Sequence, residues 1–306
     1  MVLNSYAKLN LYLEVLSKRK DNYHNLETIF ERIDLCDKII LKSLAPNKIK
    51  ITSNSRLIPK DESNLAFRAA RLLKDKFKVK AGVDIKIIKR IPVASGMAGG
   101  SSNAACVLVA LNKLWKLHLN KSKLVSLGKR LGADVPFFIY NSSFAKGSRR
   151  GDRIYLLGQL RNARFWHIVV VPRIRVSTAS VYQKWDKIAQ KARLTPPFLK
   201  YRLKKERAGL TSPNSDVRML TSALKRKNLS LISKGLFNSL EEASIKLYPE
   251  IRRIKERLSS LGLKSILMSG SGPAVFGMVP SRKEAQSLGR QLKRNRFWRI
   301  YITRTI

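Results

Sequence analysis

Apolar residues recur along this chain at two spacings. Where they fall at every second position the pattern predicts a strand, and where they fall at every third or fourth position it predicts a helix. The first spacing marks residues 10–16, 37–41, 49–52, 83–88, 137–140, 166–171, 265–269, 274–279 and 298–303. The second marks residues 64–77, 102–117, 122–131, 179–191, 215–225, 229–243, 249–261 and 282–292.

The order of these elements predicts how the chain is organised. Strands and helices are interspersed in the first half, whereas the second half groups its helices before its last strands. We therefore expect an α+β protein of two domains, residues 1–160 and 161–306. Residues 146–153 are expected to form a basic turn that contains glycine. Residues 190–213, which are basic and contain prolines, are expected to be an exposed loop.

The charge of the chain raises a question about its partners. Its 306 residues include 62 Lys and Arg against 20 Asp and Glu, a formal charge of +42. Such an excess favours polyanions, because cationic side chains neutralise phosphates. The basic residues are spread along the whole chain, however, as they are on solvated surfaces. Nucleic-acid binding therefore stays an alternative, and attraction of anionic metabolites is a milder consequence.

Other classes of protein are disfavoured by the composition. Cys36 and Cys106 are far apart in the sequence, which argues against a disulfide framework, and the three histidines lack metal-ligand spacing. The longest apolar run, residues 104–111, is much shorter than the about 20 residues of a membrane-spanning helix. The first residues do not resemble a secretory signal. We expect a cytoplasmic protein.

The most informative segment is residues 92–102, Pro-Val-Ala-Ser-Gly-Met-Ala-Gly-Gly-Ser-Ser, between a predicted strand and a predicted helix. Small side chains let backbone N–H groups approach an anion, and a helix N-terminus adds a positive dipole. We interpret the segment as a phosphate-binding loop, and a plain helix-entry turn is the alternative. It lacks the Gly-Lys-Ser/Thr of a P-loop, and the chain lacks the protein-kinase motifs.

Three further segments carry weaker signals. Lys8 and Asn10 lie on one face of the first strand, although a lone strand lysine is more often a surface residue. Asp134 lies among apolar residues, an unusual place for an unpaired carboxylate, and a turn or cap role is also open. Residues 268–277, Met-Ser-Gly-Ser-Gly-Pro-Ala-Val-Phe-Gly, predict a tight turn between two strands, which is compatible with a functional role.

In this order, the four segments resemble those of the GHMP kinase superfamily. The resemblance spans Ser5 to about Val279. It rests on residues 7–11 (Ala-Lys-Leu-Asn-Leu), 23–26 (Tyr-His-Asn-Leu), 99–105 (Gly-Gly-Ser-Ser-Asn-Ala-Ala), 131–137 (Leu-Gly-Ala-Asp-Val-Pro-Phe) and 269–273 (Ser-Gly-Ser-Gly-Pro). It implies a two-domain GHMP kinase fold, with an N-terminal ribosomal-protein-like α/β domain and a C-terminal ferredoxin-like α+β domain. The active site would lie in the cleft between them.

The resemblance also implies a reaction. ATP, with Mg²⁺ bridging its phosphates, would phosphorylate the 2-hydroxyl of 4-diphosphocytidyl-2-C-methyl-D-erythritol, a step of the non-mevalonate route to isoprenoid precursors. Asp134 would be the catalytic base and Lys8 its partner, since a nearby ammonium keeps a carboxylate ionised and helps to orient the attacking hydroxyl. The lysine would also offset charge on the transferring phosphoryl group. No residue is assigned as a metal ligand.

By the same resemblance, two sets of residues would bind the substrates. The ATP set is Asn64 and Lys89 near the adenine, with Pro92, Val93, Ala94, Ser95, Gly96, Met97, Ala98, Gly99, Gly100, Ser101 and Ser102 around the phosphates. The acceptor set is Asn10, Tyr23, His24, Thr178 and Tyr182. The cytosine ring would stack between the two tyrosines, for which a simple packing role is the alternative.

Departures from the family pattern leave other interpretations open. Ala94, Ser95 and Ala98 stand where the family often has glycine, and alanine rarely takes a positive φ. The loop is therefore expected to differ in geometry or in ATP affinity. The alternatives in function are another GHMP-type kinase, for a mevalonate-type or homoserine-type substrate, and a basic nucleic-acid-binding protein on the same fold. Monomer and homodimer are both open.

Overall fold

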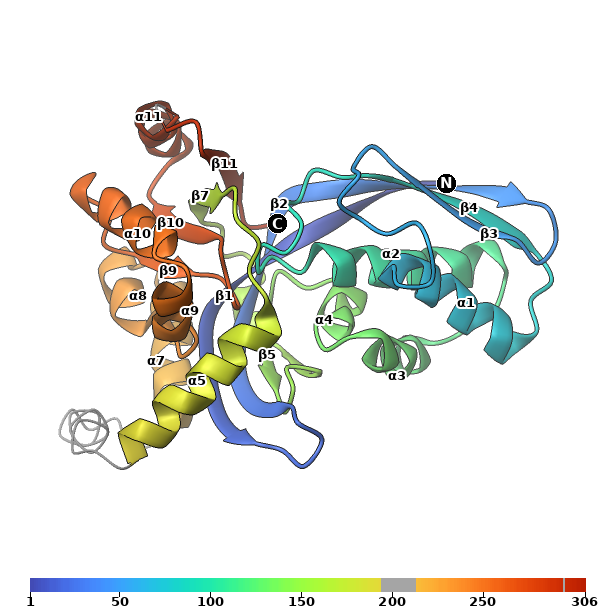
Figure 1. Ribbon diagram of the computed structural model, residues 1–306, viewed down its shortest axis with the longest axis horizontal. Helices are drawn as coiled ribbons and strands as arrows, with labels where there is room; N and C mark the ends of the chain where they lie inside the picture. The colour runs from blue at the N-terminus through green and yellow to red at the C-terminus, as the bar shows by residue number, and fades with distance from the viewer. Residues whose placement is uncertain (194–212, 294) are drawn as a thin grey trace.

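The computed structural model describes residues 1–193, 213–293 and 295–306. The predicted exposed loop at residues 190–213 lies almost wholly outside the described residues. The described part contains two β-sheets flanked by helices (Figure 1). The long strands β1 (Val2–Lys18) and β2 (His24–Leu44) belong to the first sheet and end in a hairpin beside helix α5 (Thr178–Arg193).

The first sheet has the strand order β3-β4-β2-β1-β8, with β5 and β6 added at β2. The bounds of its other strands are β3 (Ile49–Ser53), β4 (Gly82–Ile88), β5 (Phe144–Ser148), β6 (Arg153–Leu156) and β8 (Phe237–Asn238). Alternate residues such as Ile39, Leu41 and Ile85 are buried, because helices cover one face of the sheet. These helices are α1 (Leu65–Phe77), α2 (Gly99–Leu114), α3 (Lys121–Leu131) and α4 (Val135–Tyr140) (Figure 1).

The second sheet has the order β11-β7-β10-β9. Its strands are β7 (Trp166–Pro172), β9 (Ile266–Met268), β10 (Val275–Val279) and β11 (Trp298–Arg304). The other elements of this half are the 3₁₀-helix η1 (Gly158–Leu160) and helices α7 (Pro213–Lys225), α8 (Leu229–Gly235), α9 (Glu241–Leu247), α10 (Glu250–Ser260) and α11 (Arg282–Leu292).

The predicted fold class is confirmed, and most predicted elements are present. β1 and β2 are much longer than predicted, since they begin at Val2 and His24 and not at residues 10 and 37. One apolar core cluster joins the two sheets, since it contains Leu9 and Ile33 from the first and Val169 and Phe276 from the second. The predicted domain boundary after residue 160 falls between η1 and β7. The division itself stays a prediction, because β8, from the second half of the chain, pairs with β1 in the first sheet.

The predicted strand at residues 137–140 is wrong, because these residues belong to helix α4. A short apolar run does not by itself distinguish strand from helix. Here Val135 and Ile139, one helical turn apart, pack against Gly128 of α3, where a Cβ atom would lie 2.7 Å from Ile139 Cδ1. Pro136 fits the first turn of a helix, since the N–H that it lacks has no partner there.

The predicted single helix over residues 229–243 is also wrong. The chain forms α8, then strand β8, then α9. Gly235 ends α8 in close contact with Leu220, and the next residues pair with Tyr12 and Leu13 of β1. Tertiary pairing thus interrupts a sequence whose local pattern suits a continuous helix. The expected turn at residues 146–153 is shorter than predicted, because β5 ends at Ser148 and β6 begins at Arg153. Another difference is small: α2 begins at Gly99, three residues before its predicted start.

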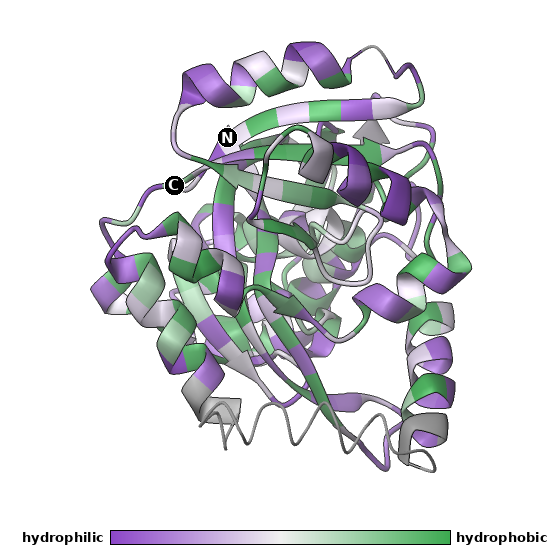
Figure 2. Cartoon of the chain, turned by 90° about the vertical axis from the view of Figure 1, so that its left-hand side faces the viewer, coloured by the Kyte–Doolittle hydropathy of each residue, from purple (hydrophilic) through white to green (hydrophobic). Residues whose placement is uncertain are grey.

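Hydrophobic residues gather in the interior strands, and hydrophilic residues lie in stripes on the outer helices (Figure 2). Across the described ranges, no helix is both long enough and apolar enough to cross a membrane.

Candidate active site

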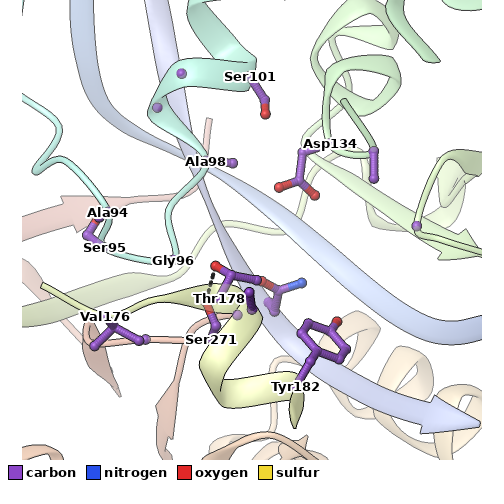
Figure 3. Close-up of a pocket in the computed structure, with 18 of the residues that line it drawn as sticks. Ala94, Ser95, Gly96, Ala98, Ser101, Asp134, Val176, Thr178, Tyr182 and Ser271 are labelled. Carbon is purple, nitrogen blue, oxygen red and sulfur yellow. Dashed lines mark hydrogen bonds between the residues drawn. The ribbon is translucent and has the colours of Figure 1, made fainter. Parts of the chain in front are cut away.

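A cavity of about 1160 Å³ opens between the start of α2, the β1–β2 hairpin and α5. We call it the central cavity. Figure 3 shows that Ser101 and Asp134 lie on one side of it and Thr178 and Tyr182 on the other. Most of the predicted site residues line it: Lys8, Asn10, Tyr23, His24, Asn64, Lys89, residues 92–96 and 98–101, Asp134, Thr178 and Tyr182. Met97 and Ser102 do not line it. Met97 belongs to the core, and the Ser102 hydroxyl accepts a hydrogen bond from Ser5.

The predicted phosphate loop has the backbone form that its small residues suggest. Ala94, Gly96 and Ala98 all have positive φ, at 52°, 79° and 55°. The two alanines therefore adopt the left-handed region that is easy only for glycine. Ala98 is the N-cap residue of α2 and provides no side-chain capping bond. The N-terminus of α2 consequently faces the cavity through backbone groups and small side chains.

The predicted phosphate loop is hydrogen-bonded to the turn at residues 268–277 and packs closely against it. Ser269 Oγ donates to the carbonyl oxygen of Gly96 at 3.1 Å, and the N–H of Ala274 donates to the carbonyl oxygen of Ser95 at 3.2 Å. A Cβ atom on Gly96 would lie 2.1 Å from the carbonyl oxygen of Ser269. Only glycine fits this contact, which ties the phosphate loop to the second sheet.

A buried carboxylate fixes both ends of the same loop. Asp37 Oδ1 accepts hydrogen bonds from the N–H groups of Arg90 and Ile91, at 2.7 and 2.8 Å. Its Oδ2 accepts from Lys89 Nζ at 2.7 Å and from Asn103 Nδ2, in α2, at 3.0 Å. The carboxylate is fully buried and makes four charge-assisted bonds. Asp37 thus connects the end of β4 to the first turns of α2.

The predicted adenine residues are already engaged in bonds within the protein. Burial lowers the pKa of the Lys89 ammonium, and its ion pair with Asp37 acts against this shift. Asn64 caps α1, where its Oδ1 accepts from the N–H of Ala66 at 2.9 Å and its Nδ2 donates to the carbonyl oxygen of Pro59 at 2.7 Å. Both residues line the cavity, and their contact with adenine stays a prediction.

Lys8 and Asp134 come together at the wall of the central cavity. Lys8 Nζ lies 3.9 Å from Asp134 Oδ2, and the Lys8 side chain is 5% exposed against 31% for Asp134. Burial lowers the pKa of the Lys8 ammonium, and Asp134 acts against this shift. The ammonium also donates to Asn10 Oδ1, whose amide nitrogen donates to Thr28 Oγ1 at 2.8 Å. Lys8 is thus held from behind, while Asp134 faces the cavity.

Two of the segments that carry the family resemblance, residues 99–105 and 131–137, meet directly beside Asp134. A Cβ atom on Gly132 would lie 3.6 Å from the hydroxyl of Ser101, so the start of α2 adjoins the turn that carries Asp134. Across the cavity, the hydroxyl groups of Thr178 and Ser271 are hydrogen-bonded at 2.9 Å (Figure 3). Asn238 of β8 donates to the carbonyl oxygens of Met268 and Gly270, which fixes the turn that carries Ser271.

The predicted cytosine-binding residues form the far end of the cavity. The His24 ring stacks on Tyr182, with centroids 4.9 Å apart and an interplanar angle of 24°. Tyr23 is 56% exposed, and the guanidinium of Arg150 lies 5.1 Å from its ring centroid. Burial raises the pKa of Tyr182. Each tyrosine ring thus has a partner within the protein, and a cytosine ring between them stays a prediction.

Sequence analysis missed four residues that belong to this arrangement: Thr28, Asp37, Arg150 and Asp186. Asp186 lies in α5 one helical turn after Tyr182, so helical spacing places both on one face. Asp37 carried the signal of a carboxylate within an apolar strand, which usually requires a buried partner. Thr28 and Arg150 gave no comparable signal.

Fold and site together are those of a GHMP kinase. A family model described as "GHMP kinases N terminal domain" matches residues 64–142, and one described as "GHMP kinases C terminal" matches residues 220–297. The protein is an ATP-dependent small-molecule kinase of this class.

Curated relatives and a solved structure show to which family of GHMP kinases the chain belongs. The chain is 39% identical over 282 residues to a 4-diphosphocytidyl-2-C-methyl-D-erythritol kinase of Bacillus subtilis (strain 168), covering 92% of this chain and 89% of the relative. It is 40% identical over 290 residues to one of Geobacillus sp. (strain WCH70), covering 94% and 91%. A crystal structure of 4-(cytidine 5'-diphospho)-2C-methyl-D-erythritol kinase matches with a TM-score of 0.75 at 30% identity, covering 100% of each chain. The chain belongs to the family of 4-diphosphocytidyl-2-C-methyl-D-erythritol kinases.

Proposed function

We propose that this kinase transfers the γ-phosphoryl group of ATP to the 2-hydroxyl of 4-diphosphocytidyl-2-C-methyl-D-erythritol, in the non-mevalonate route to isoprenoid precursors. The observation that carries the proposal is the position of Lys8 and Asp134. They lie 3.9 Å apart at the wall of the same cavity that the phosphate loop lines. Relatives that are 39% and 40% identical carry this substrate in their names.

Asp134 is the proposed base. Its carboxylate is partly exposed to the cavity, where an acceptor hydroxyl can reach it. As the hydroxyl oxygen attacks the γ-phosphorus, its proton passes to the Asp134 carboxylate. The bond from the γ-phosphorus to the bridging oxygen breaks, and ADP leaves with that electron pair. A positioned base of this kind contributes about 10²- to 10⁴-fold to the rate.

Lys8 is proposed to serve the same step through its charge. Its ammonium favours the ionised form of Asp134 and offsets negative charge on the phosphoryl group during its transfer. The hydrogen bond to Asn10 and the surrounding burial hold it in one position, so little reorganisation is needed during the reaction. Asn10 and Thr178 are proposed to contact the acceptor near the reacting hydroxyl.

Mg²⁺ is proposed to enter with ATP. Within the described ranges, no group of three or more His, Cys, Asp or Glu side chains could hold a metal ion. Mg²⁺ is commonly held by substrate phosphates and one or two protein oxygens. The Ser101 hydroxyl points into the space beside the α2 N-terminus and could supply such an oxygen (Figure 3). Bound there, Mg²⁺ would neutralise phosphate charge.

The other predictions about partners are kept as part of this proposal. The phosphate loop would hold the ATP phosphates, and Tyr23, His24 and Tyr182 would bind the cytidine. We expect a cytoplasmic monomer or homodimer.

The test is a comparison of acceptors in a coupled ADP-release assay. We expect turnover with the cytidyl substrate and none above background with mevalonate or homoserine. Preference for a non-nucleotide alcohol would contradict the proposed substrate while leaving a GHMP kinase. Tight RNA binding at physiological salt without ATP turnover would instead favour a nucleic-acid-binding protein, which the charge of +42 left open.

A further inference from the structure

A cluster of three charged or titratable side chains closes the far end of the central cavity. Asp186 of α5 accepts from Lys18 Nζ at 2.9 Å with Oδ2 and contacts His24 Nε2 at 2.7 Å with Oδ1. Lys18 and His24 face each other as register partners at the end of the β1–β2 hairpin. One carboxylate therefore ties both strands of the hairpin to α5, and all three residues line the cavity.

The contact between Asp186 and His24 determines where the imidazole proton is. Burial raises the pKa of Asp186, but hydrogen bonds from Lys18 and His24 outweigh it, and the pKa lies below the usual range for aspartate. An ionised carboxylate only accepts hydrogen bonds. Nε2 of His24 must therefore carry a proton in the 2.7 Å contact. In the neutral imidazole, Nδ1 is then left as an acceptor.

Two aromatic neighbours hold the imidazole ring in this orientation. Tyr182 stacks on its face, and Trp185 meets it edge-on, with centroids 5.6 Å apart at 86°. The side chain of His24 is 5% exposed, so ring rotation would disturb packed neighbours. The hydrogen bond found for the His24 ring among the described residues is the one at Nε2, and His24 lines the cavity. Nδ1 is therefore available to a ligand in the cavity.

We propose that Asp186 is a positioning residue that selects the base of the acceptor nucleotide by fixing the tautomer of His24. With Nε2 protonated, Nδ1 requires a donor from the ligand. The exocyclic amine of cytosine supplies one. Uracil has a carbonyl oxygen at the corresponding position, and its lone pair would face the lone pair of Nδ1. The inference rests on the proposed function, since it assumes that the cytidine part of the substrate lies beside His24. It assigns discrimination between cytosine and uracil to a residue that contacts His24 and not the base.

The first test reads the tautomer without substrate. The chain has three histidines, so ¹⁵N-labelled histidine gives few imidazole signals, and that of His24 is identified by its loss in His24→Asn. We expect wild-type His24 to be protonated at Nε2 only. In Asp186→Asn the amide can donate to Nε2 as well as accept from it, so the signals should shift toward the Nδ1-protonated form. A wild-type spectrum with the proton on Nδ1, or an unchanged spectrum in the variant, overturns the inference.

The second test measures base selection. Wild-type enzyme and Asp186→Asn are compared for kcat/KM with cytidyl and uridyl forms of the acceptor, and for binding of CDP and UDP by calorimetry. We expect the preference for cytidine to fall about tenfold, the value of one hydrogen bond to a charged or fixed partner. An unchanged preference in Asp186→Asn contradicts the inference, because it makes Asp186 structural only.

Asp21→Asn is the matched control. It removes from the same cavity lining a carboxylate that binds Arg19, at 3.0 Å, and not His24. Asp21 Oδ1 also accepts from the N–H of Tyr23 at 3.2 Å, a bond that the asparagine oxygen can keep. The His24 spectrum and the cytidine preference should both stay at wild-type values. An equal loss of preference in Asp21→Asn would attribute the effect to general charge and contradict the specific role of Asp186. If the wild-type enzyme does not act on the cytidyl acceptor, the proposed function fails, and the spectrum with the CDP and UDP affinities still decides the role of Asp186.

Discussion

The two ends of the central cavity are built by different means. One end is proposed to bind phosphate, and we call it the phosphate end. Its wall consists of backbone, small side chains and a helix N-terminus, and the groups that fix it, such as Asp37, lie buried behind it. The other end is proposed to bind cytidine, and we call it the cytidine end. Its wall consists of large and charged side chains from the β1–β2 hairpin and α5, among them Tyr23, His24 and Asp186. A phosphate group is recognised by geometry and dipoles, whereas a base is recognised by ring faces and hydrogen-bond donors and acceptors.

This difference predicts which property a substitution at each end should change. Changes behind the phosphate loop should alter ATP binding and stability together, since the loop geometry depends on the fold. Changes at the cytidine end should alter acceptor binding alone, because an exposed ring such as Tyr23 supports little of the core. Asp134 lies between the two ends and should affect neither binding step.

Replacing the base should have the largest effect. Asp134→Asn keeps the size of the side chain but removes its capacity to take a proton. We expect kcat to fall by about 10²- to 10⁴-fold. The KM for the acceptor and the affinity for an ATP analogue, measured by calorimetry, should stay within a few-fold of wild type. Near-normal turnover would contradict the role of Asp134, and a large loss of ATP affinity would place it in the phosphate end instead.

Asp37→Asn should damage the phosphate end. The amide leaves Lys89 as a buried ammonium without its anionic partner and sets an NH₂ donor among other donors. We expect the free energy of unfolding to fall by about 3–5 kcal/mol. In the folded fraction, the KM for ATP should rise more than the KM for the acceptor. Urea unfolding and initial-rate kinetics measure the two effects.

Two further variants separate the effect of losing a charge from the effect of losing the hydrogen bonds that Asp37 makes. Asp34→Asn removes a carboxylate from the same strand whose pair with Arg304 is exposed and 3.7 Å long. Its Oδ1 also accepts from Thr303 Oγ1 and from the N–H of Arg304, and the asparagine oxygen can keep these bonds, so the loss should be at most about 1 kcal/mol. Adding Lys89→Met to Asp37→Asn removes the unpaired charge and should recover part of the stability. No recovery in the double variant would show that the backbone bonds to Arg90 and Ile91 matter more than the ion pair.

Tyr23→Ala should act on the cytidine end with a smaller effect. Stacking of a base on an aromatic ring contributes about 1–3 kcal/mol, so the KM for the cytidyl acceptor should rise between about 5- and 150-fold, with the KM for ATP unchanged. Tyr155→Ala is the control, since Tyr155 is also exposed and has an arginine, Arg153, over its ring, but it does not line the cavity. If both KM values rise equally in Tyr23→Ala, the ring supports the cavity as a whole.

The same contrast explains how much could be predicted from the sequence. The phosphate loop is contiguous, and small residues between a strand and a helix have few other uses, so one segment was enough to predict a phosphate-binding role. Asp186, which contacts both Lys18 and His24, lies in a distant helix, and no spacing in the sequence links it to them. The Lys8–Asp134 pair was predicted only through the family resemblance. The strand β8 was missed because a two-residue pairing with β1 overrides local helical preference.

Ala98→Gly should have the smallest effect, and the opposite sign. Ala98 has φ 55° and ψ 33°, where an alanine is strained by about 1–2 kcal/mol relative to the right-handed region. Glycine removes that strain. It also increases the conformational entropy of the unfolded chain, which opposes the gain by up to about 1 kcal/mol. We therefore expect the free energy of unfolding to rise by about 0.5 kcal/mol in urea titrations. Ala105→Gly, inside α2, should instead lose about 1 kcal/mol, because glycine is disfavoured in a helix interior. A loss of the same size in Ala98→Gly would mean that the loop is not strained at this position, and that the alanines suit the phosphate end as well as glycine does.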